Sequence, residues 1–215
     1  ACAQVWISPR AMRNGIIVTV LFACLIGSAL LFYAGWELII VGLLCVLFAF
    51  LYTTGPYPLS YNGWGDVLVI VFFGFVPVGG TYYVQALTWT SDTTVASLIC
   101  GLLIDTLLVV NNYRDREADA RSGKRTVIVR FGEKFGRYLY LMLGVAASLL
   151  CFWFFFEGHL FAALLPLLYL IPHVLTWRRM VQIHSGKKLN SILGETSRNM
   201  LLMGILLSIG FLIRH

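Results

Sequence analysis

A short polar stretch, residues 111–126, follows a strongly apolar segment at residues 95–110 and constrains what this chain can become. Within it, Asn111, Asp115 and Asp119 are spaced four residues apart. Four residues are slightly more than one helical turn, so the three side chains would form one polar stripe on a helix. Polar groups in an apolar helix are costly, which favours a functional site over a solvated charged loop.

The stripe has the chemistry of a magnesium site. Mg²⁺ keeps several waters and takes one or two carboxylates together with substrate phosphates. We therefore expect Asp115 and Asp119, assisted by Asn111, to be the metal ligands and the catalytic residues. Cations beside carboxylates suit a complex of a metal with a diphosphate. The cations within or just after the stripe are Arg114, Arg116, Arg121, Lys124 and Arg125.

The composition is that of a membrane protein. Of the 215 residues, 59% are hydrophobic and only 12% are charged. A soluble domain of this size would carry about twice that charged fraction. The net charge of +6 is compatible with nucleic-acid binding. Because the basic residues are confined to a few segments, membrane topology explains them better, and no nucleic-acid partner is expected.

Seven apolar stretches are long enough for the membrane core, which takes about 20 helical residues. The expected fold class is therefore all-α, a polytopic transmembrane helical bundle that forms one domain over residues 1–215. The expected spans lie near residues 15–34, 36–53, 66–86, 93–113, 138–157, 159–177 and 197–213.

The basic residues predict the orientation of these spans. With seven spans, the N-terminus and the loops expected at 54–65, 114–137 and 178–196 share one face, and that face collects 15 of the 16 Lys and Arg residues. Only Arg214 falls on the other face. The positive-inside rule makes the basic face cytoplasmic. We expect a bacterial inner-membrane protein whose polar stripe opens to the cytoplasm, where Mg²⁺ and phosphorylated substrates are available.

From residue 111 onward the chain resembles a known family, the intramembrane aromatic prenyltransferases of the UbiA superfamily. Weaker similarity at residues 7–12, 52–59, 72–85 and 189–196 extends the resemblance over nearly the whole chain. The similarity to the family's second aspartate-rich motif is carried by Asn111-Asn112-Tyr113-Arg114-Asp115, Asp119, Gly123-Lys124-Arg125-Thr126 and Val129-Arg130-Phe131-Gly132.

The resemblance implies a reaction: transfer of a polyprenyl group from polyprenyl diphosphate to an aromatic quinone precursor, within the lipid bilayer and with Mg²⁺. The Asn-Asn-Tyr-Arg-Asp form is most similar to the branch that acts on 1,4-dihydroxy-2-naphthoate. That branch releases CO₂ and pyrophosphate and yields demethylmenaquinone. Hydroxybenzoate, homogentisate or chlorophyllide acceptors remain alternatives within the family.

Further substrate contacts are expected around the stripe. By resemblance, Arg114, Lys124 and Arg125 would contact the diphosphate. Tyr52 and Tyr61 flank a Gly-Pro loop and are also expected to reach the diphosphate, although tyrosines at a lipid interface are the ordinary alternative.

The chain departs from the family pattern at its N-terminus. Family members have nine helices and two aspartate-rich motifs, the first of the type N-x-x-x-D-x-x-x-D. No such motif precedes residue 52 here. We therefore expect the chain to be N-terminally incomplete and to lack the first two helices of the family fold.

Asp105 stands apart because it lies deep within an expected span. It falls about 80° from Asp115 and about 40° from Asp119 around a helix, and roughly 15 Å deeper. An ionisable group at that depth suggests function. The alternative is a protonated carboxyl group that is hydrogen-bonded to a neighbouring helix.

Two other function classes compete with prenyl transfer. CDP-alcohol phosphotransferases also place D-x-x-x-D on membrane helices, but Asp115 lacks the glycine that their pattern requires next to it. A membrane transporter would use the stripe as an ion path, and it should show paired broken helices in two symmetric halves. No such symmetry is visible in the sequence.

Overall fold

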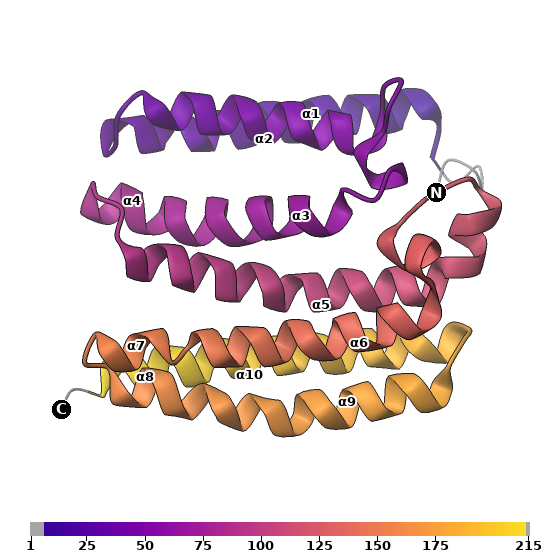
Figure 1. The fold of residues 1–215 in the computed structure, drawn as a ribbon. Coiled ribbons are helices and arrows are strands. Elements are labelled where there is room, and N and C mark those ends of the chain that lie inside the picture. Colours follow the sequence, from indigo (N-terminus) through magenta and orange to yellow (C-terminus); the bar gives the residue numbers. More distant parts are fainter. Residues whose placement is uncertain (1–6, 214–215) are drawn as a thin grey trace.

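The computed structural model describes residues 7–213, and these residues form helices and connecting loops without a strand. A π-helical stretch, Ile70–Gly79, joins α3 to α4, and a 3₁₀ turn, Leu165–Tyr169, joins α8 to α9 (Figure 1). The α-helices are α1 (Pro9–Ser28), α2 (Glu37–Thr53), α3 (Gly65–Val69), α4 (Gly80–Ala86), α5 (Ser91–Arg121), α6 (Val127–Leu150), α7 (Trp153–Phe156), α8 (Leu160–Leu164), α9 (Leu170–Ile183) and α10 (Asn190–Leu212).

Six helical segments are long and apolar enough to cross a membrane, so the chain is an integral membrane protein and the expected all-α bundle is confirmed. The expected second span corresponds to α2, an apolar helix of 17 residues that is shorter than the others. The six candidate spans are Pro9–Phe32, Gly65–Ala86, Ser91–Arg121, Val127–Phe156, Leu160–Ile183 and Lys187–Leu212.

The expected loops at 114–137 and 178–196 are wrong, because most of their residues are helical. Helix α5 continues to Arg121 and α6 begins at Val127, so only residues 122–126 connect them. Helix α6 begins there because the Thr126 hydroxyl accepts a hydrogen bond from the Val129 backbone nitrogen at 3.3 Å. Hydropathy marks only the apolar part of a helix, whereas the helix itself continues through polar residues.

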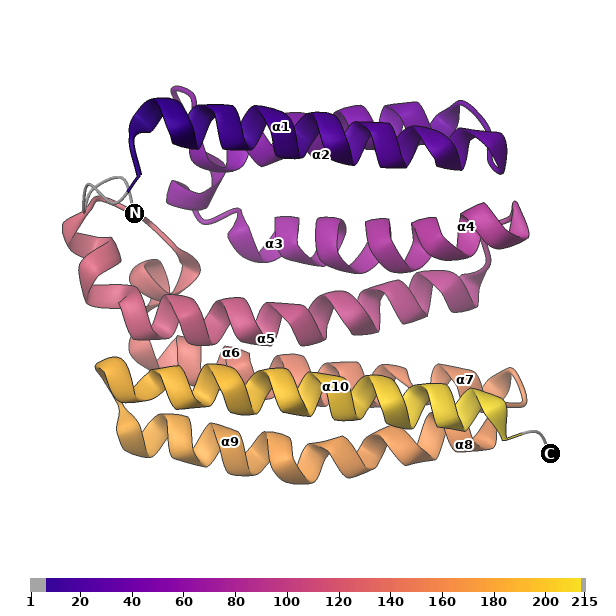
Figure 2. The ribbon, with the colours of Figure 1, turned by 180° about the vertical axis from the view of Figure 1, so that it is seen from behind.

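The helices run antiparallel, so alternate connections lie at the same end of the bundle (Figures 1 and 2). The α2–α3, α5–α6 and α9–α10 connections share one end, close to the start of α1. The α1–α2, α4–α5 and α7–α8 connections share the other. This arrangement gathers the basic segments at one end, as the charge pattern predicts, while Arg214 lies outside the described residues.

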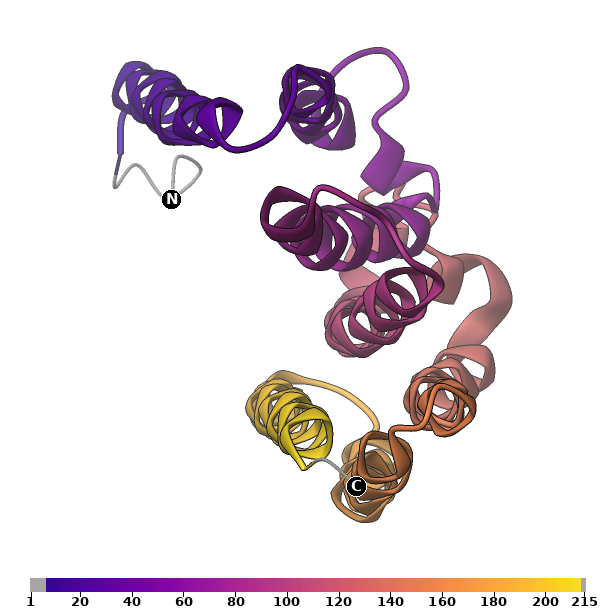
Figure 3. The same ribbon diagram turned by 90° about the vertical axis from the view of Figure 1, so that its left-hand side faces the viewer.

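Viewed along the helices, the chain follows an open curve with α1 and α10 at its two ends (Figure 3). Helices α1 and α2 contain no buried residue, and both core clusters are built from the chain after residue 98.

Close helix packing places the third span against α5. A Cβ atom on Gly74 would lie 2.5 Å from the Ser97 carbonyl oxygen, and one on Gly101 would lie 2.9 Å from the Ile70 carbonyl oxygen. Only glycines permit this approach, which is typical of helix pairs in membranes. The contact places the start of α3 beside the polar half of α5.

Candidate functional site

The polar stripe lies on α5, as the four-residue spacing predicts. Its three members, Asn111, Asp115 and Asp119, all fall within this continuous helix of 31 residues. The Asp119 side chain is only 11% exposed, whereas the Asp115 side chain is 38% exposed. The carboxylates therefore differ in environment, with the accessible one a turn closer to the middle of the helix.

Arg114 organises the middle of the stripe. Its Nε and Nη2 atoms donate hydrogen bonds to the two carboxylate oxygens of Asp115 at 2.7 and 2.6 Å. Nη2 also donates to the Oδ1 atom of Asn111 at 2.7 Å, and Nη1 donates to Asn190 on α10 at 3.0 Å. This guanidinium therefore holds two predicted metal ligands together and ties α5 to α10.

The connection between α5 and α6 folds back over the end of the stripe. The Lys124 ammonium lies 3.1 Å from the Asp119 carboxylate and 5.4 Å from the centre of the Tyr61 ring. The Arg125 backbone nitrogen donates to the Tyr61 carbonyl oxygen at 2.7 Å, which joins this connection to the α2–α3 loop. Gly63 makes the approach possible, since it has a φ of +81° and its Cβ would lie 2.9 Å from the Arg125 carbonyl oxygen.

A cavity of about 420 Å³ lies between the two loops and α5. Four predicted site residues line it: Asn111, Lys124, Tyr52 and Tyr61. Arg114, Asp115, Asp119 and Arg125 are not among its lining residues, and the Arg125 side chain is exposed. The full lining is Tyr52, Thr53, Ser60, Tyr61, Gly63, Gly65, Asp66, Leu108, Asn111, Asn112, Lys124 and Thr126.

Asp66 is the cavity residue that the sequence reading missed. It sits in the first turn of α3, and its Oδ1 atom is buried without a hydrogen-bond partner among the described residues. Its position in the sequence could have indicated a site residue. Asp66 is a lone carboxylate at the edge of an apolar span, close to the Gly-Pro loop that Tyr52 and Tyr61 flank.

Asp105 lies deeper on α5 and is 1% exposed. Its Oδ1 atom is also buried, with no hydrogen bond from any residue that the structure describes. The bond to a neighbouring helix that would explain a purely structural carboxyl group is therefore not seen at this oxygen. Asp105 is not among the lining residues of the cavity.

A charged network on the far side of Tyr113 braces this half of α5 against α6. Glu133 forms ion pairs with Arg116 at 3.2 Å and with Arg137, and its carboxylate lies 3.1 Å from the Nε2 atom of His184. Arg137 donates from Nε to the Tyr113 hydroxyl at 3.0 Å. Arg116 therefore supports the helix that carries the stripe and is directed away from the stripe itself.

The donor set of the stripe fits Mg²⁺ in its chemistry. Two carboxylates one turn apart with an amide oxygen match an ion that takes few protein ligands and completes its shell with water and phosphate. Arg114 and Lys124 occupy these carboxylates in the structure. Within residues 7–213, no cluster of three or more Asp, Glu, His or Cys side chains is arranged to hold a metal by itself.

Comparison with known proteins places the chain in a family. The model of the UbiA prenyltransferase family matches residues 3–209. A 1,4-dihydroxy-2-naphthoate octaprenyltransferase of Haemophilus influenzae is 36% identical over 96% of this chain and 70% of that protein. Proteins of the same name from Escherichia coli and Mycobacterium leprae are 38% and 39% identical over 67% and 66% of this chain. No solved structure matches significantly.

The chain belongs to the UbiA prenyltransferase family. It is thus a membrane-embedded member of a family of prenyltransferases. The match spans about half the length of the Escherichia coli and Mycobacterium leprae relatives, 49% and 48%.

Proposed function

We propose that this protein transfers a polyprenyl group from polyprenyl diphosphate to 1,4-dihydroxy-2-naphthoate. In this reaction the allylic C–O bond breaks, a C–C bond forms on the ring, and pyrophosphate and CO₂ leave. The product of the transfer is the prenylated naphthoquinol, which is the reduced form of demethylmenaquinone. The observation that carries the proposal is the stripe of Asn111, Asp115 and Asp119 with Arg114 and Lys124 directly on it, next to a polar cavity.

The cationic and the tyrosine side chains around the cavity would have different roles in binding the diphosphate. Lys124, which faces both Asp119 and the cavity, would turn its ammonium to the diphosphate. Arg114 would move from Asp115 to the same group, because guanidinium binds phosphate bidentately. Tyr52 and Tyr61 also line the cavity and would orient the leaving group.

Asp115 and Asp119, with Asn111, would hold Mg²⁺ once Arg114 and Lys124 turn to the substrate. Bound Mg²⁺ would neutralise the diphosphate and make pyrophosphate a better leaving group. UbiA enzymes typically use this ion, and the donor set of the stripe fits it.

Dihydroxynaphthoate is favoured over the other acceptors by the names of the relatives, which act on that acceptor and align over 66–96% of this chain. Hydroxybenzoate and homogentisate are the competing acceptors. A transporter role has lost its support, because the family match identifies an enzyme.

Membranes that contain the full-length protein should form prenylated naphthoquinol from dihydroxynaphthoate and a polyprenyl diphosphate only when Mg²⁺ is present. Product is measured by chromatography, with and without EDTA, and the matched acceptors 4-hydroxybenzoate and homogentisate are tested in parallel. Formation that EDTA leaves unchanged would refute the metal assignment. Faster prenylation of 4-hydroxybenzoate or homogentisate would refute the assignment of dihydroxynaphthoate as the acceptor.

We also propose that the end of the bundle that carries the stripe faces the cytoplasm of a bacterial inner membrane, because the basic segments gather there. In a background without the natural cysteines, Ser122→Cys should resist a membrane-impermeant thiol reagent added to intact cells. Glu157→Cys, in the connection at the opposite end, should react. The reverse labelling pattern would invert the topology.

A further inference from the structure

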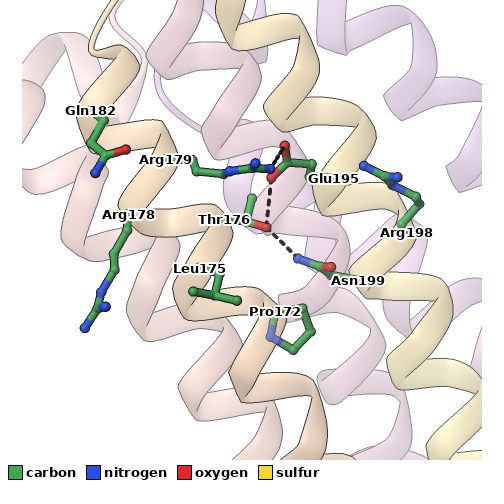
Figure 4. A pocket seen from close by; sticks show the side chains of 9 residues that line it. All are labelled: Pro172, Leu175, Thr176, Arg178, Arg179, Gln182, Glu195, Arg198 and Asn199. Atoms are coloured by element: carbon green, nitrogen blue, oxygen red, sulfur yellow. Dashed lines mark hydrogen bonds and ion pairs between the residues drawn. The ribbon is translucent and has the colours of Figure 1, made fainter.

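A second cavity lies between α9 and α10 and shares no residue with the first (Figure 4). Its volume is about 580 Å³, within the usual range for ligand-binding pockets. Its lining residues are Pro172, Leu175, Thr176, Arg178, Arg179, Gln182, Glu195, Arg198 and Asn199. Neither the stripe nor its loops contribute to it, so the proposed reaction leaves this cavity without a role.

The single carboxylate in this cavity is already neutralised. Arg179 on α9 forms an ion pair with Glu195 on α10 at 2.7 Å. The Thr176 hydroxyl donates to the other Glu195 oxygen at 3.3 Å and accepts a hydrogen bond from the Asn199 amide at 3.0 Å. These interactions form a fixed polar floor between the two helices, as the dashed lines in Figure 4 show.

Two arginines remain without a partner. Arg178 and Arg198 are exposed, and neither has an ion pair or hydrogen bond among the described residues. They come from α9 and α10, on either side of the polar floor (Figure 4). With Arg179 and Glu195 cancelling each other, these two side chains give the cavity a net positive charge, which calls for an anionic ligand.

The cavity also has a gradient of polarity along the helices. Arg178 lies five residues before the end of α9, and Arg198 lies eight residues after the start of α10. These positions are about 8 and 12 Å from the helix ends, a depth at which arginine reaches phospholipid headgroups. Pro172 and Leu175 lie further from this end, nearer the middle of the candidate span Leu160–Ile183, where acyl chains pack.

We propose that this cavity binds an anionic phospholipid, with the start of an acyl chain against Leu175. Arg178 and Arg198, whose exposed guanidinium groups point apart in Figure 4, would turn toward the headgroup phosphate from the two sides of the polar floor. Basic pockets between transmembrane helices at the cytoplasmic side are known to hold such headgroups. The cavity has more room than a free phosphate ion needs. A metal–diphosphate complex fits it poorly, because its only carboxylate is paired with Arg179.

The test measures the melting temperature of the purified full-length protein in neutral detergent, without any enzymatic readout. Saturating phosphatidylglycerol should raise it by roughly 5–10 °C relative to phosphatidylcholine, because binding to the folded state stabilises it. The double variant Arg178→Gln/Arg198→Gln should lose most of this shift. The matched control Arg10→Gln/Arg13→Gln removes the same charge from α1, at the same end of the bundle, and should keep the shift.

An equal shift in the Arg178/Arg198 variant, or an equal loss in the Arg10/Arg13 control, would overturn the site. Inorganic phosphate at the same concentration should give no shift, and a shift as large as that of phosphatidylglycerol would overturn the lipid as the ligand. If the double variant does not fold, Arg178→Gln and Arg198→Gln are measured singly. Each should reduce the shift, and an unchanged shift in both would contradict the proposal.

Discussion

Asp115→Asn should lower turnover by at least about 100-fold while leaving the protein folded in the membrane. Losing a residue that only supports a metal ligand already costs about 10- to 100-fold, so losing a charged ligand should cost more. An amide keeps the shape of the side chain and one carbonyl oxygen, but it lacks the anionic charge that holds Mg²⁺ against water. The half-exposed Asp115 has room for that ion once Arg114 releases it.

Prenyl transfer in membranes at saturating Mg²⁺ measures this effect, and the amount of folded protein is determined in the same samples. Glu117→Gln is the matched control, since it removes a carboxylate that is exposed on the same helix, off the stripe. Asp105→Asn is expected to be nearly neutral for turnover, because Asp105 lies ten residues, or about 15 Å, from Asp115 along α5 and does not line the cavity. Activity that survives in Asp115→Asn but is lost in Asp105→Asn would place the metal deeper in the membrane.

Lys124→Gln should raise the KM for polyprenyl diphosphate by about 10- to 100-fold. Hydrogen bonds to charged groups contribute about 1.5–3 kcal/mol, which corresponds to that range of affinity. Lys124 is the expected diphosphate contact because it lines the cavity and its ammonium group contacts the Asp119 carboxylate and the Tyr61 ring. Steady-state kinetics with varied diphosphate at fixed acceptor provide the measurement.

Arg125→Gln removes the same charge from the next residue and separates the two loop cations that the family resemblance assigns to the diphosphate, because only Lys124 lines the cavity. The Arg125 side chain is exposed and outside the cavity lining, whereas its backbone joins the two loops and is unaffected by the substitution. Its KM should therefore stay within about threefold of the natural value, since exposed charges contribute little. Equal increases in both variants would show that the loop attracts the substrate by its overall charge rather than through Lys124.

Local patterns in the sequence were sufficient for the class of fold and for the stripe. Apolar length predicts membrane helices because every spanning backbone must satisfy its own hydrogen bonds. The spacing of Asn111, Asp115 and Asp119 predicts one helical face, and α5 confirms that geometry. The same local patterns predicted helix ends that are too early, because hydropathy does not distinguish a polar helix from a loop at 114–137.

The cavity is formed by contacts between residues that are far apart in the sequence. Asp66 meets Asn111 there because Gly74 and Gly101 let two helices approach closely, and Lys124 meets Tyr61 because the Arg125 backbone binds the α2–α3 loop. The periodicity of the sequence does not predict such contacts between distant residues. The sequence by itself determined that this is a helical membrane protein with one acidic stripe, because these properties follow from near neighbours along the chain. Only the tertiary structure decided which cations cover the stripe and which loops enclose it, because packing between helices sets those distances.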